Sequence, residues 1–306
     1  MIEEKVIVGN DTEYPLDGKL ALPDDAGECI PAVVLVHDQG PLNMDGKTKA
    51  LTPLMDIAHA LADKGIAVLR YDKRTLTYGR KMKKNLSDLT VKEETIEDAV
   101  LALKLLQADP RFEKAFILGH GLGGMLAPRI DAEGGNCDGI IIAAGSPRKL
   151  RNIMLDQCEE ALLKYTGVMK QIAEKQAEEM SASLAAIDYM TDEEAKEAYA
   201  AGKTKAYYYK EMEAHPARRY LRDLNKPLFV FQGDMDFQFF SDVDYESYKR
   251  LLNAKPNVTF KLYHGLNHLF TTSCKTGTLR DYNVPGRVSG KVTADIAKWV
   301  RDFSLP

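Results

Sequence analysis

Apolar runs of strand length alternate with amphipathic stretches of helix length along most of this chain. The strand-like runs lie at 32–36, 66–69, 115–118, 140–143, 227–232 and 258–263. The main helix-like stretches lie at 54–64, 91–108, 122–132 and 292–303. Strands that are apolar on both faces and joined through helices are typical of a parallel sheet covered by helices on both sides. With two short strands expected near 5–8 and 20–22, the pattern predicts an α/β fold with a mostly parallel central sheet.

The strand-like runs stop between Leu150 and Asp223. There the chain becomes rich in Glu, Lys, Ala and Met at helical spacing, and strand-like runs resume only at Pro227. A long helical segment inside an α/β pattern indicates an insertion into one domain. We therefore predict a core domain formed by 1–149 and 224–306, interrupted by a helical cap at 150–223.

The composition and charge of the chain limit the classes of binding partner that can be expected. The 306 residues include 41 basic and 45 acidic side chains, which gives no global field to attract nucleic acid or an anionic membrane. No apolar run approaches the ~20 residues that span a bilayer, and the first residues lack the positive charge of a signal peptide. We expect a cytoplasmic protein with a small-molecule partner and reduced thiols, since no metal or disulfide spacing links Cys29, Cys137, Cys158 and Cys274.

A glycine-rich segment joins the third of the strand-like runs to the helix that follows. Gly119, Gly121 and Gly124 satisfy the spacing of a dinucleotide-binding turn. That turn also requires an acid at the end of the next strand and belongs after the first strand of the sheet. Here the run at 140–143 is followed by Ala, Gly, Ser and Pro, so the segment does not favour a nucleotide and no cofactor is predicted.

The same segment fits a nucleophile elbow, with one exception. Small residues at both ends, Gly119 and Gly123, let a strand reverse sharply into a helix and present the middle residue at the carboxyl edge of the sheet. The middle residue is Gly121, where a serine would normally stand. Glycine tolerates the strained backbone of an elbow, but it has no side chain to attack a carbonyl group.

An acid and a histidine follow in the chain order that an elbow requires. Asp236 lies in the turn after the run at 227–232, with Asp234 as an alternative. His268 lies in the loop after the run at 258–263. A histidine oriented by a carboxylate is the usual proton shuttle of acyl transfer, and we predict that Asp236 and His268 belong to one site.

An oxyanion hole needs backbone donors near the elbow. The loop that follows the run at 32–36 reads His37-Asp38-Gln39-Gly40-Pro41. We predict Gln39 N–H and Leu122 N–H as the two donors. A simple glycine-containing turn is the alternative for this loop.

At this point the chain resembles the α/β-hydrolase superfamily, and within it the bacterial carboxylesterases of the dienelactone-hydrolase-like branch. The resemblance lies in the segments 13–20, 65–74, 119–129, 144–148, 232–236, 265–270 and 282–286. It implies an α/β-hydrolase fold, with the nucleophile position at Gly121, the acid and base at Asp236 and His268, and no metal or cofactor.

Two departures from that family pattern affect the chemistry. The family elbow reads Gly-His-Ser-Leu-Gly-Gly, and only its serine is replaced, by Gly121. The family oxyanion loop usually reads His-Gly-Ser-Gly-Pro, whereas this chain carries Asp38 and Gln39. If the Asp38 side chain points inward, its charge is expected to repel the developing oxyanion.

These observations lead to two hypotheses. One is a carboxylic-ester hydrolase of the serine type acting on a small acyl ester, inactive or very weak here because Gly121 occupies the nucleophile position, either by engineered replacement or by natural loss. The other is a non-hydrolytic ligand-binding protein, or a catalyst of proton transfer by a His–Asp pair. His120, Tyr208 and Tyr209 are predicted to contact the ligand, and the sequence is compatible with a homodimer.

Overall fold

The computed structural model describes residues 1–24, 27, 29–82, 87–200, 205–272 and 277–304. Cys29, Cys137 and Cys158 carry free thiols, and Cys274 lies outside the described residues. None of the helices in the described part of the chain combines the length and the hydropathy that a membrane crossing requires.

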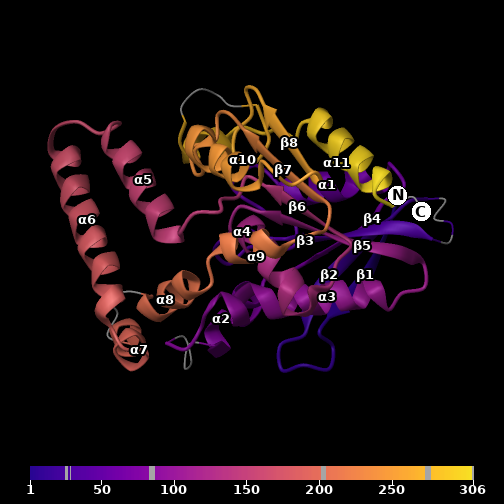
Figure 1. Cartoon of the computed structure of the whole chain (residues 1–306), viewed down its shortest axis with the longest axis horizontal. Coiled ribbons are helices and arrows are strands. Elements are labelled where there is room, and N and C mark those ends of the chain that lie inside the picture. Colours follow the sequence, from indigo (N-terminus) through magenta and orange to yellow (C-terminus); the bar gives the residue numbers. More distant parts are fainter. Residues whose placement is uncertain (25–26, 28, 83–86, 201–204, 273–276, 305–306) are drawn as a thin grey trace.

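Eight strands of the described residues form one sheet in the order β1-β2-β4-β3-β5-β6-β7-β8 (Figure 1). The first two strands pair antiparallel, β2 pairs antiparallel with β4, and all other neighbours are parallel. Their bounds are β1 Ile2–Val8, β2 Leu16–Leu22, β3 Ile30–Val36, β4 Ala67–Tyr71, β5 Phe112–His120, β6 Gly139–Ala143, β7 Leu228–Gly233 and β8 Val258–Tyr263. The predicted mostly parallel sheet is confirmed.

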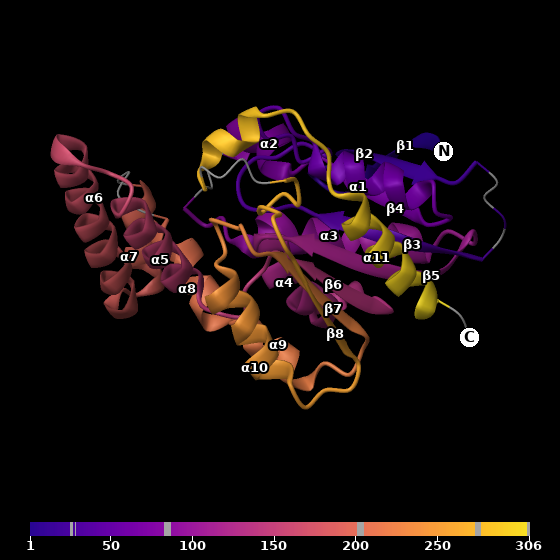
Figure 2. The same ribbon diagram turned by 90° about the horizontal axis from the view of Figure 1, so that it is seen from above.

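Helices cover both faces of this sheet (Figure 2). On one face lie α1 (Pro53–Ala62) and α11 (Gly290–Asp302), where Trp299 packs against Phe116 and Phe229. The other face carries α3 (Glu97–Gln107), α4 (Leu122–Ile130), α9 (Ala217–Asp223) and α10 (Glu246–Leu252). The inner strands are apolar on both sides because each side is buried against helices.

Shorter elements complete the core. The helix α2 spans Arg74–Met82. Single π-helical turns lie at Lys92–Ile96, Asp131–Gly135 and Ser241–Tyr245, and a 3₁₀ turn lies at Leu279–Asn283. The first of these turns leads directly into α3. The helix predicted at 91–108 is therefore a π-helical turn followed by an α-helix.

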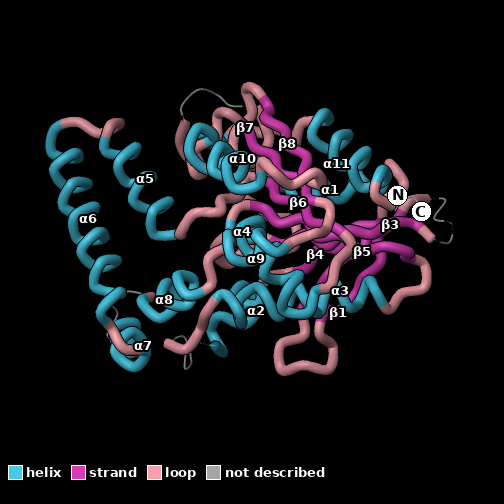
Figure 3. The backbone as a smooth tube through the Cα atoms, in the orientation of Figure 1, coloured by secondary structure: helices cyan, strands magenta, loops and turns pink. Residues whose placement is uncertain are grey.

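Residues 150–223 contain helices and no strand in their described part. After α5 (Leu150–Leu162) and α6 (Gly167–Ala186) come a 3₁₀ turn at Ile187–Tyr189, then α7 (Asp192–Ala200), α8 (Ala206–Ala214) and α9. Figures 1 and 3 show α5 and α6 standing side by side, away from the sheet. Leu163, in the connection between them, and Val168 and Met169, in the first turn of α6, expose apolar side chains.

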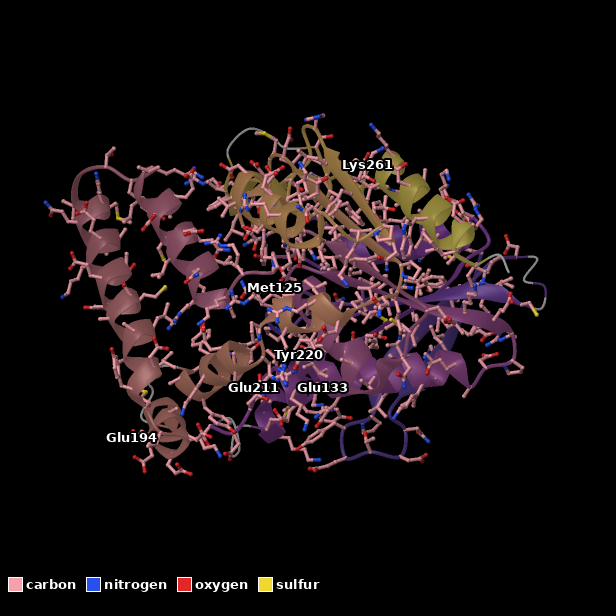
Figure 4. The ribbon with its side chains drawn as sticks, viewed as in Figure 1. Met125, Glu133, Glu194, Glu211, Tyr220 and Lys261 are labelled. Atoms are coloured by element: carbon pink, nitrogen blue, oxygen red, sulfur yellow. The ribbon has the colours of Figure 1, made fainter. Side chains whose placement is uncertain are left out.

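A buried arginine fastens this helical segment to the core. Arg129, on α4, donates from Nε to Glu133 Oε1 at 2.7 Å and from Nη2 to Glu211 Oε1, on α8, at 2.5 Å. Figure 4 shows Glu133, Glu211 and Tyr220 close together beside α4. Because Arg129 is only 3% exposed, its charge depends on these two carboxylates for compensation.

Replacing this arginine is expected to destabilise the fold. Arg129→Met should lower the free energy of unfolding by about 1–3 kcal/mol, because it leaves two partly buried carboxylates without their cation. Lys175→Met, which removes an exposed pair with Glu179, should change the same quantity by less than about 0.5 kcal/mol. Urea unfolding of both variants measures the difference, and equal effects would contradict the anchoring role.

Candidate active site

The carboxyl ends of the central strands meet at one edge of the sheet. In the parallel register Val36 of β3 lies beside Gly119 of β5, and His120 lies beside Ala143 of β6. On the next strands Gly233 of β7 lies beside Tyr263 of β8. The loops that follow these strands therefore converge, and they carry the predicted acid, base and oxyanion segments.

The turn between β5 and α4 has the geometry of an elbow. Gly121 adopts φ +54° and ψ −117°, and its N–H donates to Ala143 O at 2.9 Å. A Cβ on Gly119 would lie 2.2 Å from Gly123 O, and one on Gly123 would lie 2.5 Å from His37 O. The small residues at both ends are thus required by close approach of the backbone.

Asp236 and His268 form a buried pair beside this turn. Asp236 Oδ2 lies 2.8 Å from His268 Nδ1, and both side chains are inaccessible to solvent. Asp236 Oδ1 accepts from the N–H groups of Gln238 and Phe239, and the Phe239 ring stacks on the imidazole. The alternative acid of the sequence, Asp234, instead contacts the exposed His264.

Asp38 occupies the space above Gly121. Its side chain points inward and is 13% exposed. Oδ1 accepts from Leu122 N–H at 2.7 Å, and Oδ2 lies 3.1 Å from His268 Nε2. The sequence predicts an unopposed charge if this side chain points inward, whereas the structure pairs that charge with the imidazole.

The two carboxylates determine the protonation of His268. Burial lowers the pKa of His268, but the charges and hydrogen bonds of Asp236 and Asp38 outweigh burial and raise that pKa to about 10. Burial raises the pKa of Asp38, but the hydrogen bond and charge of His268 hold it well below its usual range. The resting site is therefore a carboxylate, an imidazolium and a second carboxylate in a row.

The two predicted oxyanion donors lie in different settings. Leu122 N–H is at the start of α4 and is already bonded to Asp38. Gln39 is exposed and borders the cavity beside Asp38. The donor role of Gln39 N–H stays a prediction.

The three predicted ligand contacts are separated in space. His120 lines the cavity beside Asp38, and its Nε2 contacts His268 O at 2.9 Å. Burial and the charge of His268 lower the pKa of His120 to about 4. Tyr208 is buried with its hydroxyl on Glu94, and Tyr209 borders a separate groove with Met154 and Met180.

The cavity next to Asp38 has a volume of about 180 Å³. This is below the ~300–1,000 Å³ of typical ligand pockets, so it suits a small molecule. Its lining residues come from the loops after β3, β7 and β8, from the last residue of β5 and from α1: Asp38, Gln39, Leu42, Gly46, Thr48, Pro53, Leu54, His120, Gln238, Leu269, Leu279 and Tyr282. None of these lining residues lies in 150–223, so Tyr208 and Tyr209 do not border this cavity.

Two positioning groups, Lys73 and Gln238, were not predicted from the sequence. Lys73 donates from Nζ to Asp38 O at 2.9 Å and is almost fully buried. Gln238 Nε2 donates to Tyr282 Oη at 2.7 Å within the cavity lining. The polar run after the apolar strand 66–69 was a usable signal for Lys73, since a charge beside a buried strand end needs a partner.

Asp38, His120 and His268 could hold a metal ion. Each offers one ligand atom, and the three atoms lie within 4.8 Å of one another. Two of these groups are already paired with each other, and a metal would have to displace a proton from His268. The arrangement therefore fits acid–base chemistry without an ion.

The comparisons with known proteins point to hydrolases. Residues 43–273 match the family described as Serine aminopeptidase, S33. Over 299 residues the chain is 33% identical to Esterase EstD of Thermotoga maritima, covering 97% of this chain and 67% of that one. The fold is similar to that of the Pyrococcus furiosus esterase PF2001, at 13% identity and TM-score 0.59, with 99% and 92% of the two chains covered. It is also similar to Est1E from Butyrivibrio proteoclasticus, at 14% identity and TM-score 0.58, with 98% of each chain covered.

The buried charge triad predicts a pH dependence of stability. The pKa of His268 is higher in the folded protein, about 10, than in the unfolded chain, ~6.5. The protonated imidazole therefore stabilises the fold fully below pH ~6.5, and this stabilisation is lost as the pH rises towards about 10. Asp38→Asn removes one of the two carboxylates, so the decline in the free energy of unfolding between these pH values should be shallower than in the wild type. Urea unfolding across that range measures it, with His264→Gln as an exposed control. A slope unchanged in Asp38→Asn would contradict the charge coupling.

Proposed function

This chain belongs to the Serine aminopeptidase family of α/β-hydrolases, and within that family we propose that it hydrolyses small carboxylic esters by acid–base catalysis at Asp38 and His268. One observation carries the proposal: the Asp38 carboxylate lies between Leu122 N–H and His268 Nε2, at 2.7 and 3.1 Å. The relationship to Esterase EstD supports an ester as the substrate. Membership of the dienelactone-hydrolase-like branch stays a prediction from the sequence.

The opposite pKa shifts of the two groups assign their roles. Neighbouring titratable groups whose pKa values are pushed apart are natural acid and base partners. Asp38 remains ionised and accepts a proton as a water molecule attacks the acyl carbon. His268 remains protonated and gives its Nε2 proton to the departing alkoxide. The proton on Asp38 then passes to His268, 3.1 Å away, which restores the resting site and leaves an acid and an alcohol.

Gly121 and Asp38 support each other in this arrangement. A Cβ on Gly121 would lie 2.2 Å from Asp38 Oδ1 and 2.3 Å from its Cγ. The Asp38 side chain therefore leaves no room for the family serine at position 121, and it fits where it does only because Gly121 has no Cβ. This favours a natural site over an isolated engineered replacement of serine, because replacing serine alone does not account for Asp38.

The acid role of His268 can be separated from the base role of Asp38 by the leaving group. Asp38→Asn should lower kcat at least about a hundredfold for both ethyl acetate and p-nitrophenyl acetate, because both need an activated water. His268→Gln should lower kcat for ethyl acetate far more than for p-nitrophenyl acetate, because p-nitrophenolate can leave without being protonated. Asp234→Asn, a carboxylate in the adjacent turn, is the matched control. Equal losses for the two esters in His268→Gln would contradict the acid role.

The serine route should return only when two positions change together. Gly121→Ser alone is expected to remain as slow as the wild type on p-nitrophenyl acetate, because Asp38 fills the space that the serine needs. Asp38→Gly combined with Gly121→Ser should exceed either single variant at least about a hundredfold, a strongly non-additive gain. Gly65→Ala places a Cβ at φ +83° with nothing within 4 Å, and it controls for backbone strain. Full recovery by Gly121→Ser alone would show that Asp38 is no obstacle.

A non-hydrolytic role is the second candidate, and the same contact favours it. Leu122 N–H is already bonded to Asp38, so an incoming carbonyl oxygen finds that donor occupied. If wild type, Asp38→Asn and Asp38→Gly with Gly121→Ser all fail to exceed buffer hydrolysis while remaining folded, the cavity is better explained as a binding site.

A further inference from the structure

We infer that Asp38 is also a nucleophile, and that this site opens small epoxides by forming a covalent ester between the Asp38 side chain and a saturated carbon of the substrate. This activity goes beyond ester hydrolysis, in which Asp38 only moves a proton. The elbow itself carries no nucleophile, since Gly121 has no side chain. A carboxylate on the neighbouring loop stands in its place.

The two oxygens of Asp38 are held for different tasks. Oδ1 accepts from Leu122 N–H, the backbone donor at the start of α4, at 2.7 Å. Oδ2 lies 3.1 Å from His268 Nε2, and Asp38 is one of the residues that line the cavity. If Oδ2 carries an alkyl group, water attacking Cγ develops negative charge on Oδ1, where Leu122 N–H already donates. The hydrogen bond from Leu122 N–H to Oδ1 thus serves as the oxyanion donor for the enzyme's own ester.

The steps balance with water as the only co-reactant. In the first, Oδ2 forms a bond to a ring carbon, the carbon–oxygen bond of the epoxide breaks, and the ring oxygen takes a proton to become a hydroxyl. In the second, His268 Nε2 removes a proton from water and the hydroxide attacks Cγ. The tetrahedral intermediate then breaks its Cγ–Oδ2 bond, so Oδ2 leaves as the alcohol oxygen of the diol and takes the proton from His268. The proton left on the new Asp38 carboxyl group passes to His268, which restores the resting site.

The charge of Asp38 switches His268 between these steps. With Asp38 ionised, the imidazole is flanked by two carboxylates and keeps its proton. Esterification makes Asp38 neutral and removes one of these charges, so the imidazole releases its proton more readily and can serve as a base. The proton released from His268 can supply the one that the ring oxygen takes. Asp236 stays in place throughout and orients the ring.

The cavity also contains a proton donor of its own. Tyr282 Oη accepts from Gln238 Nε2 at 2.7 Å, and among the described residues no acceptor is bonded to its proton. Burial, together with the charges of Asp236 and Asp38, raises the pKa of Tyr282, so the hydroxyl keeps this proton. A neutral hydroxyl facing a cavity of about 180 Å³ suits the oxygen of a small strained ring.

A strained ring is favoured over an ester for the covalent route. When a carboxylate adds to an ester carbonyl, the tetrahedral intermediate expels the carboxylate more readily than an alkoxide, because the carboxylate is the far weaker base. Opening an epoxide is driven by ring strain and proceeds in one displacement, so there is no tetrahedral intermediate that could expel the carboxylate again. Covalent chemistry at Asp38 is therefore specific for a saturated carbon, and water serves as the nucleophile for esters.

Isotope labelling tests the covalent step directly. Excess wild-type protein is mixed with propylene oxide in H₂¹⁸O for a single turnover, and the diol and the peptide containing Asp38 are analysed by mass spectrometry. We expect ¹⁸O in Asp38 and unlabelled oxygen in the first diol formed, because the diol takes its oxygen from the carboxylate. Label in the diol with none in Asp38 would mean direct attack by water and would overturn the inference, as would the absence of any diol.

Variants give a second, independent measurement. His268→Gln should accumulate the Asp38 adduct, with the mass of one added propylene oxide, because the second step lacks its base. Asp38→Asn should form no adduct and lose at least about a hundredfold in diol formation, whereas Asp234→Asn should behave as the wild type. An adduct on another residue in His268→Gln would overturn the assignment. Hydrolysis of ethyl acetate, measured on the same preparations, shows whether the ester activity stands or fails separately.

Discussion

The contact between the Asp38 carboxylate and the His268 imidazolium is the interaction on which the rest of the site depends. It neutralises an inward-pointing charge, holds the proton on His268 together with Asp236, and occupies the donor at the start of α4. Buried charges of this kind persist only when each is paired and hydrogen-bonded. Lys73 helps to hold Asp38 in place, because its Nζ donates to the backbone oxygen of Asp38.

This contact also explains why an elbow without a nucleophile keeps the rest of its machinery. The tight passage of β5 into α4 requires Gly119 and Gly123 whatever residue stands between them. The acid and base remain paired because their loops follow strands in fixed register. Only the space above Gly121 differs, and Asp38 fills it. The elbow, the acid and the base thus keep their arrangement, and in the proposed reactions Asp38 takes the place of the serine, which is consistent with function residing in the site and not in the fold.

Two side-chain contacts join the helical segment at 150–223 to the core near the site. Arg129, on the helix that starts at the elbow, reaches Glu211 of α8, and Tyr208 reaches Glu94, whose other oxygen lies 3.8 Å from Lys73. The segment thus contacts residues that support Asp38, although none of its described residues lines the cavity. Met180, Met190 and Tyr207 pack against the cluster around Leu184 and Ile187, whereas Tyr208 and Met212 are part of the core of the sheet domain.

The sequence by itself determined the alternation of strands and helices, the elbow at Gly121 and the order of Asp236 and His268, because periodicity and glycine spacing are local properties. It also singled out Asp38 as unusual. What only the tertiary structure decided is where that carboxylate points and what compensates it. Asp38 and His268 are separated by most of the chain, and their pairing depends on the register of β3, β5 and β8 and on the absence of a side chain at Gly121. The same holds for Lys73 and Tyr282, whose roles arise from contacts across the sheet edge that no spacing along the chain encodes.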